Sequence, residues 1–224
     1  MLELAWQGAE RGFTSIGISG GEPFLLKEMP ELIAQIAQLL PVVVLTNGTL
    51  FTPRLLERLR PLGQLPVSLQ ISLDSSVAEA NDQGRADGNF DTVIEAIPRL
   101  IELGLKVRIA TTGAAGGSDP DLCALHRSLG IEEEDHIVRP VVRRGRALDL
   151  GIGVAATVDN LPPELSITAD GAFWSPFAPT LHDQRLDTDL LISRTVLPLS
   201  KPLEVMLSLA KGLPPGSDVS LNIR

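Results

Sequence analysis

Hydrophobic positions along the chain alternate between helical spacing and short continuous runs, which predicts repeated strand–helix units. Residues 2–11 carry apolar side chains at helical spacing and end at Gly12, which predicts an opening helix. A short β-rich segment follows at 14–19, and a second helical pattern begins at Pro30. In such repeats each helix follows a strand, yet no strand precedes the opening helix. We therefore expect the chain to begin inside a unit.

The strand–helix unit recurs further along the chain. Strand patterns cover residues 41–46, 67–72, 105–111 and 136–142. Helical patterns lie between them at 52–62, at 90–101 and around Cys123, with a polar loop over 74–88. Pro98 is expected to kink the second of these helices. Five strands in a strand–helix rhythm predict an α/β fold, a parallel barrel or part-barrel whose first strand is missing.

The rhythm ends near residue 146, where the composition changes. Residues 151–163 are rich in loop formers, and residues 165–174 form a hairpin pattern with Asp170-Gly171 between two strand-like runs. Three aromatic residues, Phe173, Trp174 and Phe177, are expected to pack the appendage onto the barrel, or else to line a substrate-facing wall. The sequence thus predicts a part-barrel over 1–146 and a small hairpin-containing appendage over 147–224.

Charge and hydropathy narrow the classes of partner. The 224 residues carry a formal net charge of −9, and binding to a nucleic-acid backbone needs a basic face, so nucleic acid is not an expected partner. No run approaches the roughly 20 apolar residues of a membrane span, and the first residues lack a secretory signal pattern. We expect a cytoplasmic protein without a membrane partner.

Cysteine and histidine usage predicts no metal site built from this chain. Cys123 is the single cysteine of the sequence, and its apolar neighbours at helical spacing favour a buried, inert thiol. The three histidines, His126, His136 and His182, show no ligand spacing.

Candidate chemistry begins at the carboxyl end of the first predicted strand. The segment Ser19-Gly20-Gly21-Glu22-Pro23 lies there, on the rim where barrel active sites assemble. Glycines let a ligand approach the backbone, a carboxylate accepts hydrogen bonds from an ammonium group, and proline stiffens the exit. The alternative interpretation is a turn with an exposed glutamate.

With these motifs in order, the chain resembles the radical S-adenosylmethionine (SAM) superfamily from residue 1 to about 146. In that family the Gly-Gly-Glu-Pro motif receives the methionyl ammonium of SAM, a role that the resemblance gives to residues 20–23. Residues 45–49, Leu-Thr-Asn-Gly-Thr, are similar to the family's Thr-Asn-Gly step. Residues 71–74, Ile-Ser-Leu-Asp, are similar to an element whose hydroxyl and carboxylate face SAM.

A fourth segment is similar to the peptide-modifying branch of the family. Residues 81–85 and 88–91 match its loop and helix start, where the arginine pairs with the SAM carboxylate. Arg139, after the last barrel strand, is a further candidate for a carboxylate of SAM or substrate, or else part of a solvated basic loop. The expected SAM-binding residues are Gly20, Gly21, Glu22, Pro23, Thr46, Asn47, Ser72, Asp74, Arg85 and Arg139.

Simpler roles remain open for three of these residues. Ser72 and Asp74 are also suited to a helix cap or an Asx-turn, and Arg85 to a solvated loop charge.

The sequence departs from the family at its signature. The family holds three irons of a [4Fe-4S] cluster with a CxxxCxxC loop after its first strand, and this sequence contains no such loop. Since the cluster donates the electron that cleaves SAM to a deoxyadenosyl radical, the resemblance implies a catalytically silent chain with no catalytic or metal residues of its own. The hairpin resembles the SPASM appendage and implies a peptide substrate, but Ser175-Pro176 stands where a cysteine is expected.

Three hypotheses follow. In the first, the chain is an N-terminally truncated form of a radical SAM enzyme. In the second, it is a cluster-free module that binds SAM or a peptide as a scaffold. The third, a barrel with unrelated chemistry, requires all four motif matches to be accidental.

Overall fold

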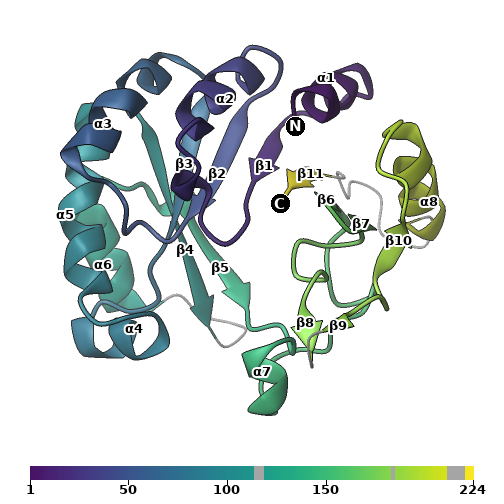
Figure 1. The fold of residues 1–224 in the computed structure, drawn as a ribbon. Helices are drawn as coiled ribbons and strands as arrows, with labels where there is room; N and C mark the ends of the chain where they lie inside the picture. Colours follow the sequence, from purple (N-terminus) through teal and green to yellow (C-terminus); the bar gives the residue numbers. More distant parts are fainter. Residues whose placement is uncertain (114–118, 183–184, 211–219) are drawn as a thin grey trace. The chain divides into compact units, whose positions relative to one another are not determined.

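A computed structural model describes residues 1–113, 119–182, 185–210 and 220–224 (Figure 1). The chain forms two compact units. The central unit comprises Gly21–Gln38 and Val42–Pro140, and the terminal unit comprises Met1–Gly20, Leu39–Pro41 and Val141–Arg224. The division of the sequence at residue 146 stays a prediction.

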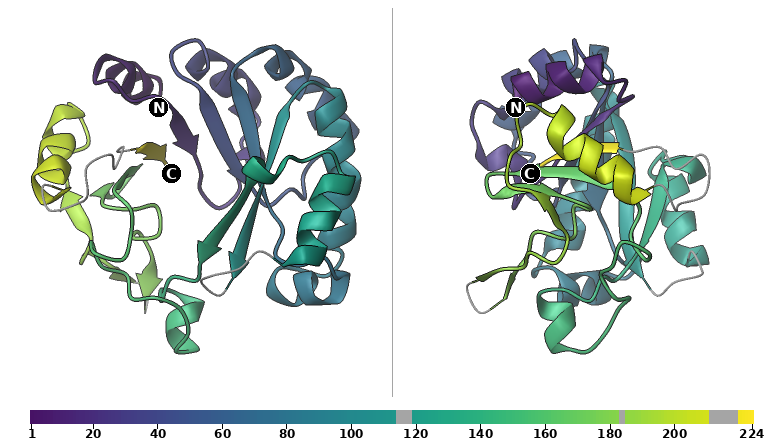
Figure 2. Two further views of the ribbon diagram at one scale, coloured as in Figure 1. Left: turned by 180° about the vertical axis from the view of Figure 1, so that it is seen from behind. Right: turned by 90° about the vertical axis from the view of Figure 1, so that its right-hand side faces the viewer.

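Four parallel strands form the sheet of the central unit. Their order is β2 (Val42–Thr46), β3 (Val67–Ser72), β4 (Lys106–Gly113) and β5 (His136–Pro140). The helices are α2 (Met29–Ile36), α3 (Pro53–Leu59), α4 (Ala78–Gly84), α5 (Asn89–Glu102) and α6 (Pro120–Ser128), with short 3-10 turns at Pro23–Leu25, Arg60–Gln64 and Glu133–Asp135. The helices α3, α5 and α6 lie along one face of these strands, as Figure 1 and the left view of Figure 2 show. The predicted parallel α/β architecture is confirmed.

The apolar periodicity of the helices explains why they pack on the face of the sheet. Fully buried side chains of α5 meet fully buried side chains of the strands, which removes apolar surface from water on both elements. These side chains include Val93, Ile97, Leu100, Val44, Leu69, Ile71 and Ile109. Pro98 lies inside α5, which continues past it to Glu102.

The prediction of a loop over 74–88 is wrong, because α4 occupies part of it. Its sequence, Ala-Glu-Ala-Asn-Asp-Gln-Gly, has no apolar periodicity, so the pattern of hydrophobic residues could not reveal it. The one side chain of α4 that is fully buried is polar, Asn81.

The sheet of the terminal unit mixes parallel and antiparallel pairs. Its order is β10 (Leu191–Ser193), β7 (Gly171–Phe173), β6 (Glu164–Thr168), β11 (Ser220–Ile223) and β1 (Ile16–Ile18). β11 pairs in parallel with both β1 and β6. The remaining elements are α1 (Leu2–Glu10), α7 (Arg146–Asp149), α8 (Ser200–Ala210) and a separate pair, β8 (Leu181–His182) with β9 (Arg185–Leu186).

The predicted hairpin is confirmed as the antiparallel pair β6–β7, but its turn differs from the expected one. Thr168 pairs with Gly171, so the turn residues are Ala169 and Asp170, and Gly171 opens β7. Gly171 has φ +144, and a Cβ there would lie 2.6 Å from the Ser193 carbonyl oxygen. The glycine therefore serves the close approach of β10 rather than the turn.

Two aromatic residues, Phe173 at the end of β7 and Trp174 directly after it, belong to the core of the terminal unit. Phe173 and Trp174 have no exposed surface, and the Trp174 indole N–H donates to the Leu161 carbonyl oxygen at 2.9 Å. Among the described helices, none is long and apolar enough to cross a bilayer.

Candidate functional site

The Glu22 carboxylate lies among hydrogen-bond donors from the end of β2. Its Oε2 accepts from the Asn47 backbone N–H at 2.9 Å, and the Thr46 hydroxyl lies 3.0 and 2.9 Å from its two oxygens. Its Oε1 also accepts from the Phe24 N–H at 3.1 Å, which caps the short turn that Pro23 begins. Glu22 is half-buried, so the carboxylate is fixed and still reachable by solvent.

The turn after β2 depends on Gly48. Its φ is +79, and a Cβ on it would lie 2.8 Å from methyl groups of both Ile71 and Val93. Only glycine meets both conditions without strain. The Gly48 N–H donates to the Thr46 hydroxyl oxygen at 3.1 Å, which turns that hydroxyl hydrogen toward Glu22. The Asn47 side chain accepts from the N–H and hydroxyl of Thr49, an Asx-type turn.

Asp74 and Arg85 form an ion pair beside the ends of β3 and β4. The distance from Asp74 Oδ2 to Arg85 Nη2 is 2.7 Å, and both side chains are mostly buried. Asp74 Oδ1 accepts from the Thr112 N–H at 2.7 Å. The Arg85 Nε is buried without a hydrogen-bond partner among the described residues, so the guanidinium has unused donor capacity.

Two buried amide side chains connect these groups. Asn81 accepts from the Asp74 N–H at 3.0 Å and donates to the Asn89 side-chain oxygen at 3.0 Å. Asn89 donates to the Asn47 carbonyl oxygen at 3.4 Å. Asn81 and Asn89 are 0% and 4% exposed, and a buried amide is stable only where its hydrogen bonds are made. These two amides join the Asn47 turn to Asp74. We use the name strand-end cluster for Glu22, Thr46, Asn47, Asp74, Asn81, Arg85 and Asn89.

Asp82 holds the segment that carries Asn89. Its carboxylate accepts from the N–H groups of Gly88 and Phe90 at 2.7 and 2.9 Å, which caps α5 from outside the helix. The Phe90 N–H is the main cause that lowers the pKa of Asp82 below its ordinary value. The ionised form thus stabilises the entry into α5.

The other candidate residues lie as follows. Gly20 ends the part of the terminal unit that contains β1, whereas Gly21, Glu22 and the buried Pro23 begin the central unit. Ser72 is the last residue of β3 and is half-buried. Arg139 lies on β5 with its Cα opposite Thr112, the residue whose N–H binds Asp74.

Sequence reasoning gave no role to four contributors, namely Asn81, Asp82, Asn89 and Thr112. The first three lie inside the segments that resemble the family, and the available signal was two asparagines flanking a glycine-rich turn before an amphipathic helix. Nothing local marks Thr112, because it acts through its backbone N–H.

A second polar group lies on α6 and β5, and it corrects one expectation, that of a buried Cys123. Cys123 is half-buried rather than buried, with its Sγ 3.9 Å from His136 Nδ1. The rings of His126 and His136 meet edge to face, with centroids 4.4 Å apart. Among the described residues, no group of three or more His, Cys, Asp or Glu side chains is placed to hold a metal ion.

The strand-end cluster has the chemistry of a zwitterion site. It offers a fixed carboxylate to an ammonium group and a guanidinium to a carboxylate. A [4Fe-4S] cluster does not fit this chain, because three thiolates are needed and the sequence holds one cysteine, half-buried on α6.

Comparison with known proteins identifies the family of the chain. The model of the radical SAM superfamily matches residues 1–129. GTP 3',8-cyclase of Syntrophomonas wolfei is 33% identical over 126 residues, covering 54% of this chain and 38% of the cyclase. Mycofactocin maturase MftC of Mycobacterium tuberculosis is 30% identical over 149 residues, covering 65% of this chain and 37% of the maturase. The chain thus spans less than half the length of these relatives.

The solved structures agree on the fold. The crystal structure of Streptococcus suis SuiB superposes with a TM-score of 0.53 at 20% identity, covering 62% of this chain and 32% of SuiB. This likeness confirms the predicted α/β part-barrel class. Since the family model covers more than half of the chain, the protein belongs to the radical SAM superfamily.

Proposed function

We propose that the strand-end cluster binds the amino-acid part of SAM. The observation that carries the proposal is the Glu22 carboxylate, fixed by Thr46 and Asn47 at the end of β2 while half-buried. A carboxylate accepts about four hydrogen bonds, and the donors from Phe24, Thr46 and Asn47 leave room for the methionyl ammonium.

Arg85 would receive the SAM carboxylate. Its pairing with Asp74 orients the guanidinium, and its unpartnered Nε keeps donor capacity for a second acceptor. Ser72 and Arg139, at the ends of the neighbouring strands, and the glycines before Glu22 complete the proposed site. A crystal structure of SuiB bound to S-adenosylmethionine, with a TM-score of 0.50, supports this choice of ligand.

The activity of a longer protein is a further part of the proposal. We infer that the chain is a truncated form, and that the longer protein contributes the thiolates of a [4Fe-4S] cluster, which supplies the electron for SAM cleavage when bound. The SPASM-like hairpin and the similarity to a maturase favour a peptide substrate. The similarity to a GTP cyclase makes GTP the compound to test beside it.

The second candidate function is a cluster-free module that binds SAM or a peptide as a scaffold. The single cysteine favours it, because the sequence itself keeps the proposed SAM residues without cluster ligands. The two candidates share the SAM site and differ in iron binding.

Titration calorimetry with SAM tests the shared site. We expect saturable heat for the chain, and a loss of affinity of at least about tenfold in Glu22→Gln and Arg85→Gln, as for a lost charge-assisted hydrogen bond. Glu57→Gln, which removes an exposed carboxylate of α3, is the matched control and should bind as the parent does. Binding that none of the site variants changes would overturn the proposal.

Iron separates the two candidates. The chain and a form extended upstream are expressed without oxygen, and their iron and sulfide are measured. Iron and sulfide in the extended form alone support the truncated enzyme, and their absence from both forms supports the scaffold.

A further inference from the structure

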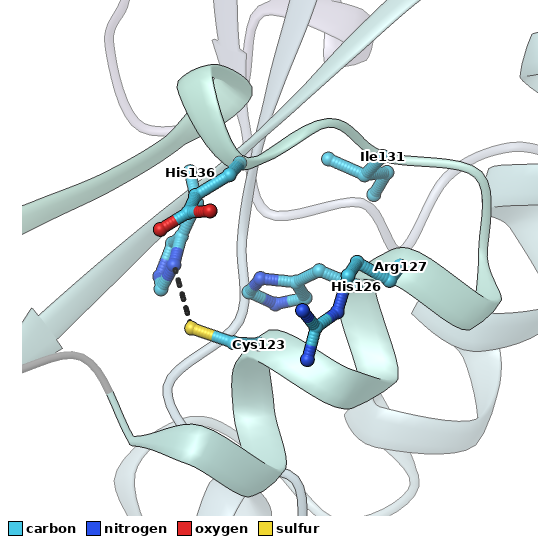
Figure 3. A pocket seen from close by; sticks show the side chains of 6 residues that line it. Cys123, His126, Arg127, Ile131 and His136 are labelled. Atoms are coloured by element: carbon cyan, nitrogen blue, oxygen red, sulfur yellow. Dashed lines mark hydrogen bonds between the residues drawn. The ribbon is translucent and has the colours of Figure 1, made fainter.

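Hydrogen-bond donors fix the proton position on His136. The Thr111 hydroxyl donates its single hydrogen to the Leu73 carbonyl oxygen at 2.8 Å. The same hydroxyl oxygen lies 2.9 Å from His136 Nε2, so it must accept from an Nε2–H. The neutral ring then has its lone pair on Nδ1, which faces the Cys123 Sγ at 3.9 Å (Figure 3). His136 is therefore oriented to accept the thiol proton.

The charge state of both rings agrees with this role. Burial lowers the pKa of His136 below its ordinary value. Burial first, and the neighbouring His136 second, lower the pKa of His126 to about 4. Both rings are neutral at neutral pH, which leaves His136 available as a base.

His126 indicates that the place is built to hold a ligand. It is 2% exposed, and neither ring nitrogen has a hydrogen-bond partner in the described part of the chain. A buried polar group without a partner costs about 1–3 kcal/mol, which a polar ligand would offset. His126 lines a small, solvent-open pocket of about 50 Å³ together with Cys123, Arg127, Ile131, Glu133 and His136. We call it the thiol pocket.

The charges of the thiol pocket select the ligand class. Arg127 and Glu133 line it with opposite charges, and both are exposed residues. A guanidinium suits a carboxylate, and a carboxylate suits an ammonium group. A zwitterion of amino-acid or short-peptide type matches both, whereas a purely anionic or cationic ligand meets one repulsive partner.

We propose that Cys123 is a modification site that exchanges with the disulfide of a zwitterionic low-molecular-weight thiol. The Cys123 thiol proton passes to His136 Nδ1, and Sγ attacks one sulfur of the disulfide. A new S–S bond forms as the old one breaks, and the leaving thiolate takes the proton from His136. The Cys123 sulfur is oxidised, the leaving sulfur is reduced, and the product is a mixed disulfide that a free thiol reverses.

The single cysteine makes the test direct, because intact-mass spectrometry of the full chain reports only Cys123. The folded chain is treated at neutral pH with four disulfides: cystine, neutral 2-hydroxyethyl disulfide, cationic cystamine and anionic dithiodipropionate. Each rate is divided by the rate of a free cysteine derivative with the same reagent. We expect the highest normalised rate with cystine, and a drop of at least about tenfold with all four in His136→Gln.

A double variant tests charge selection separately from proton transfer. Arg127→Gln combined with Glu133→Gln should remove the preference for cystine and leave the rate with the neutral disulfide unchanged. The control Arg54→Gln, at an exposed position of α3, should change neither the preference nor that rate. If His136→Gln does not fold, Thr111→Val, which frees the other ring tautomer, should lower all four rates. If the rates are unchanged in whichever of the His136 and Thr111 variants folds, His136 is not the base. If the normalised rates for the four disulfides are equal in the parent chain, the preference for a zwitterionic disulfide is wrong.

Discussion

The strand-end cluster and the thiol pocket are two polar sites of the same central unit, and they differ in how their buried groups are satisfied. The buried amides of Asn81 and Asn89 both donate and accept within the cluster. The buried His126 ring has no hydrogen-bond partner among the described residues. The amides of the first site are satisfied when the chain folds, and Arg85 Nε is its one buried donor without a hydrogen bond among the described residues. In the second site both nitrogens of the His126 ring lack hydrogen bonds, which only a ligand could supply.

This difference predicts opposite responses to substitution. Changes to Asn81 or Asn89 should cost stability, because each removes a partner from hydrogen bonds that the folded chain already makes. Replacing His126 by an apolar residue of similar size should relieve an existing penalty, because no hydrogen bond is lost there. The expectations below test this contrast, from the largest effect to the smallest.

Gly48→Ala should give the largest loss, about 4 kcal/mol of unfolding free energy. The positive φ costs a residue with a Cβ about 1–2 kcal/mol, and forcing that Cβ against Ile71 and Val93 adds about 1–3 kcal/mol. Urea unfolding measures it. Gly88→Ala is the control, since Gly88 has φ +74 but no atom within 4 Å of its would-be Cβ, and it should lose only about 1–2 kcal/mol. Equal losses would show that the close approach at Gly48 is unimportant.

His126 should make the stability depend on pH. Its pKa is lowered from 6.5 to about 4, so between these values the unfolded chain binds more protons than the folded one. The contribution of His126 to stability is therefore complete above about pH 6.5, and roughly 3 kcal/mol of it is lost as the pH drops to 4. Urea unfolding across this range should show a smaller fall in His126→Leu than in the parent. The same fall in both proteins would contradict a buried, neutral His126.

Asn81→Leu should lose about 2 kcal/mol and weaken SAM binding. The change leaves the Asp74 N–H and the Asn89 side-chain oxygen without their partner, while the leucine recovers part of the cost through apolar burial. Urea unfolding and calorimetry measure the two effects. Gln83→Leu, on an exposed position of the same helix, should change neither. Intact SAM affinity in a folded Asn81→Leu protein would show that the amides do not position the site.

The strands and the motif residues at their ends could be predicted from the sequence, because a local pattern of residues determines both. Apolar runs revealed β2, β3 and β4, and the motif residues follow directly from the ends of these strands. The pairing of Asp74 with Arg85 was not foreseen, because the motif suggested that both face a ligand. It arises from the turn that α4 makes, and α4 itself is held by a polar contact rather than an apolar stripe.

Non-local packing was beyond the sequence pattern. Cys123 and His136 lie on different elements, so their spacing carried no signal, and only the register that places Ile109 opposite His136 brings the imidazole to Thr111. The pairing of β11 with β1 joins the two ends of the chain, which no local pattern encodes.

Thr111→Val should have the smallest effect on stability and the most specific effect on the thiol pocket. The substitution keeps the shape of a buried side chain and removes its hydrogen bonds to Leu73 and His136, which should cost about 1 kcal/mol. Without the hydroxyl, nothing holds the ring proton on Nε2, and the tautomer with Nδ1–H can form. Nitrogen NMR of the histidine rings should show Nδ1 unprotonated in the parent and a mixture of tautomers in the variant. If the parent ring is protonated at Nδ1, His136 donates to the Cys123 sulfur and cannot accept the thiol proton. The proposed role of His136 as the base of the thiol pocket would then be wrong.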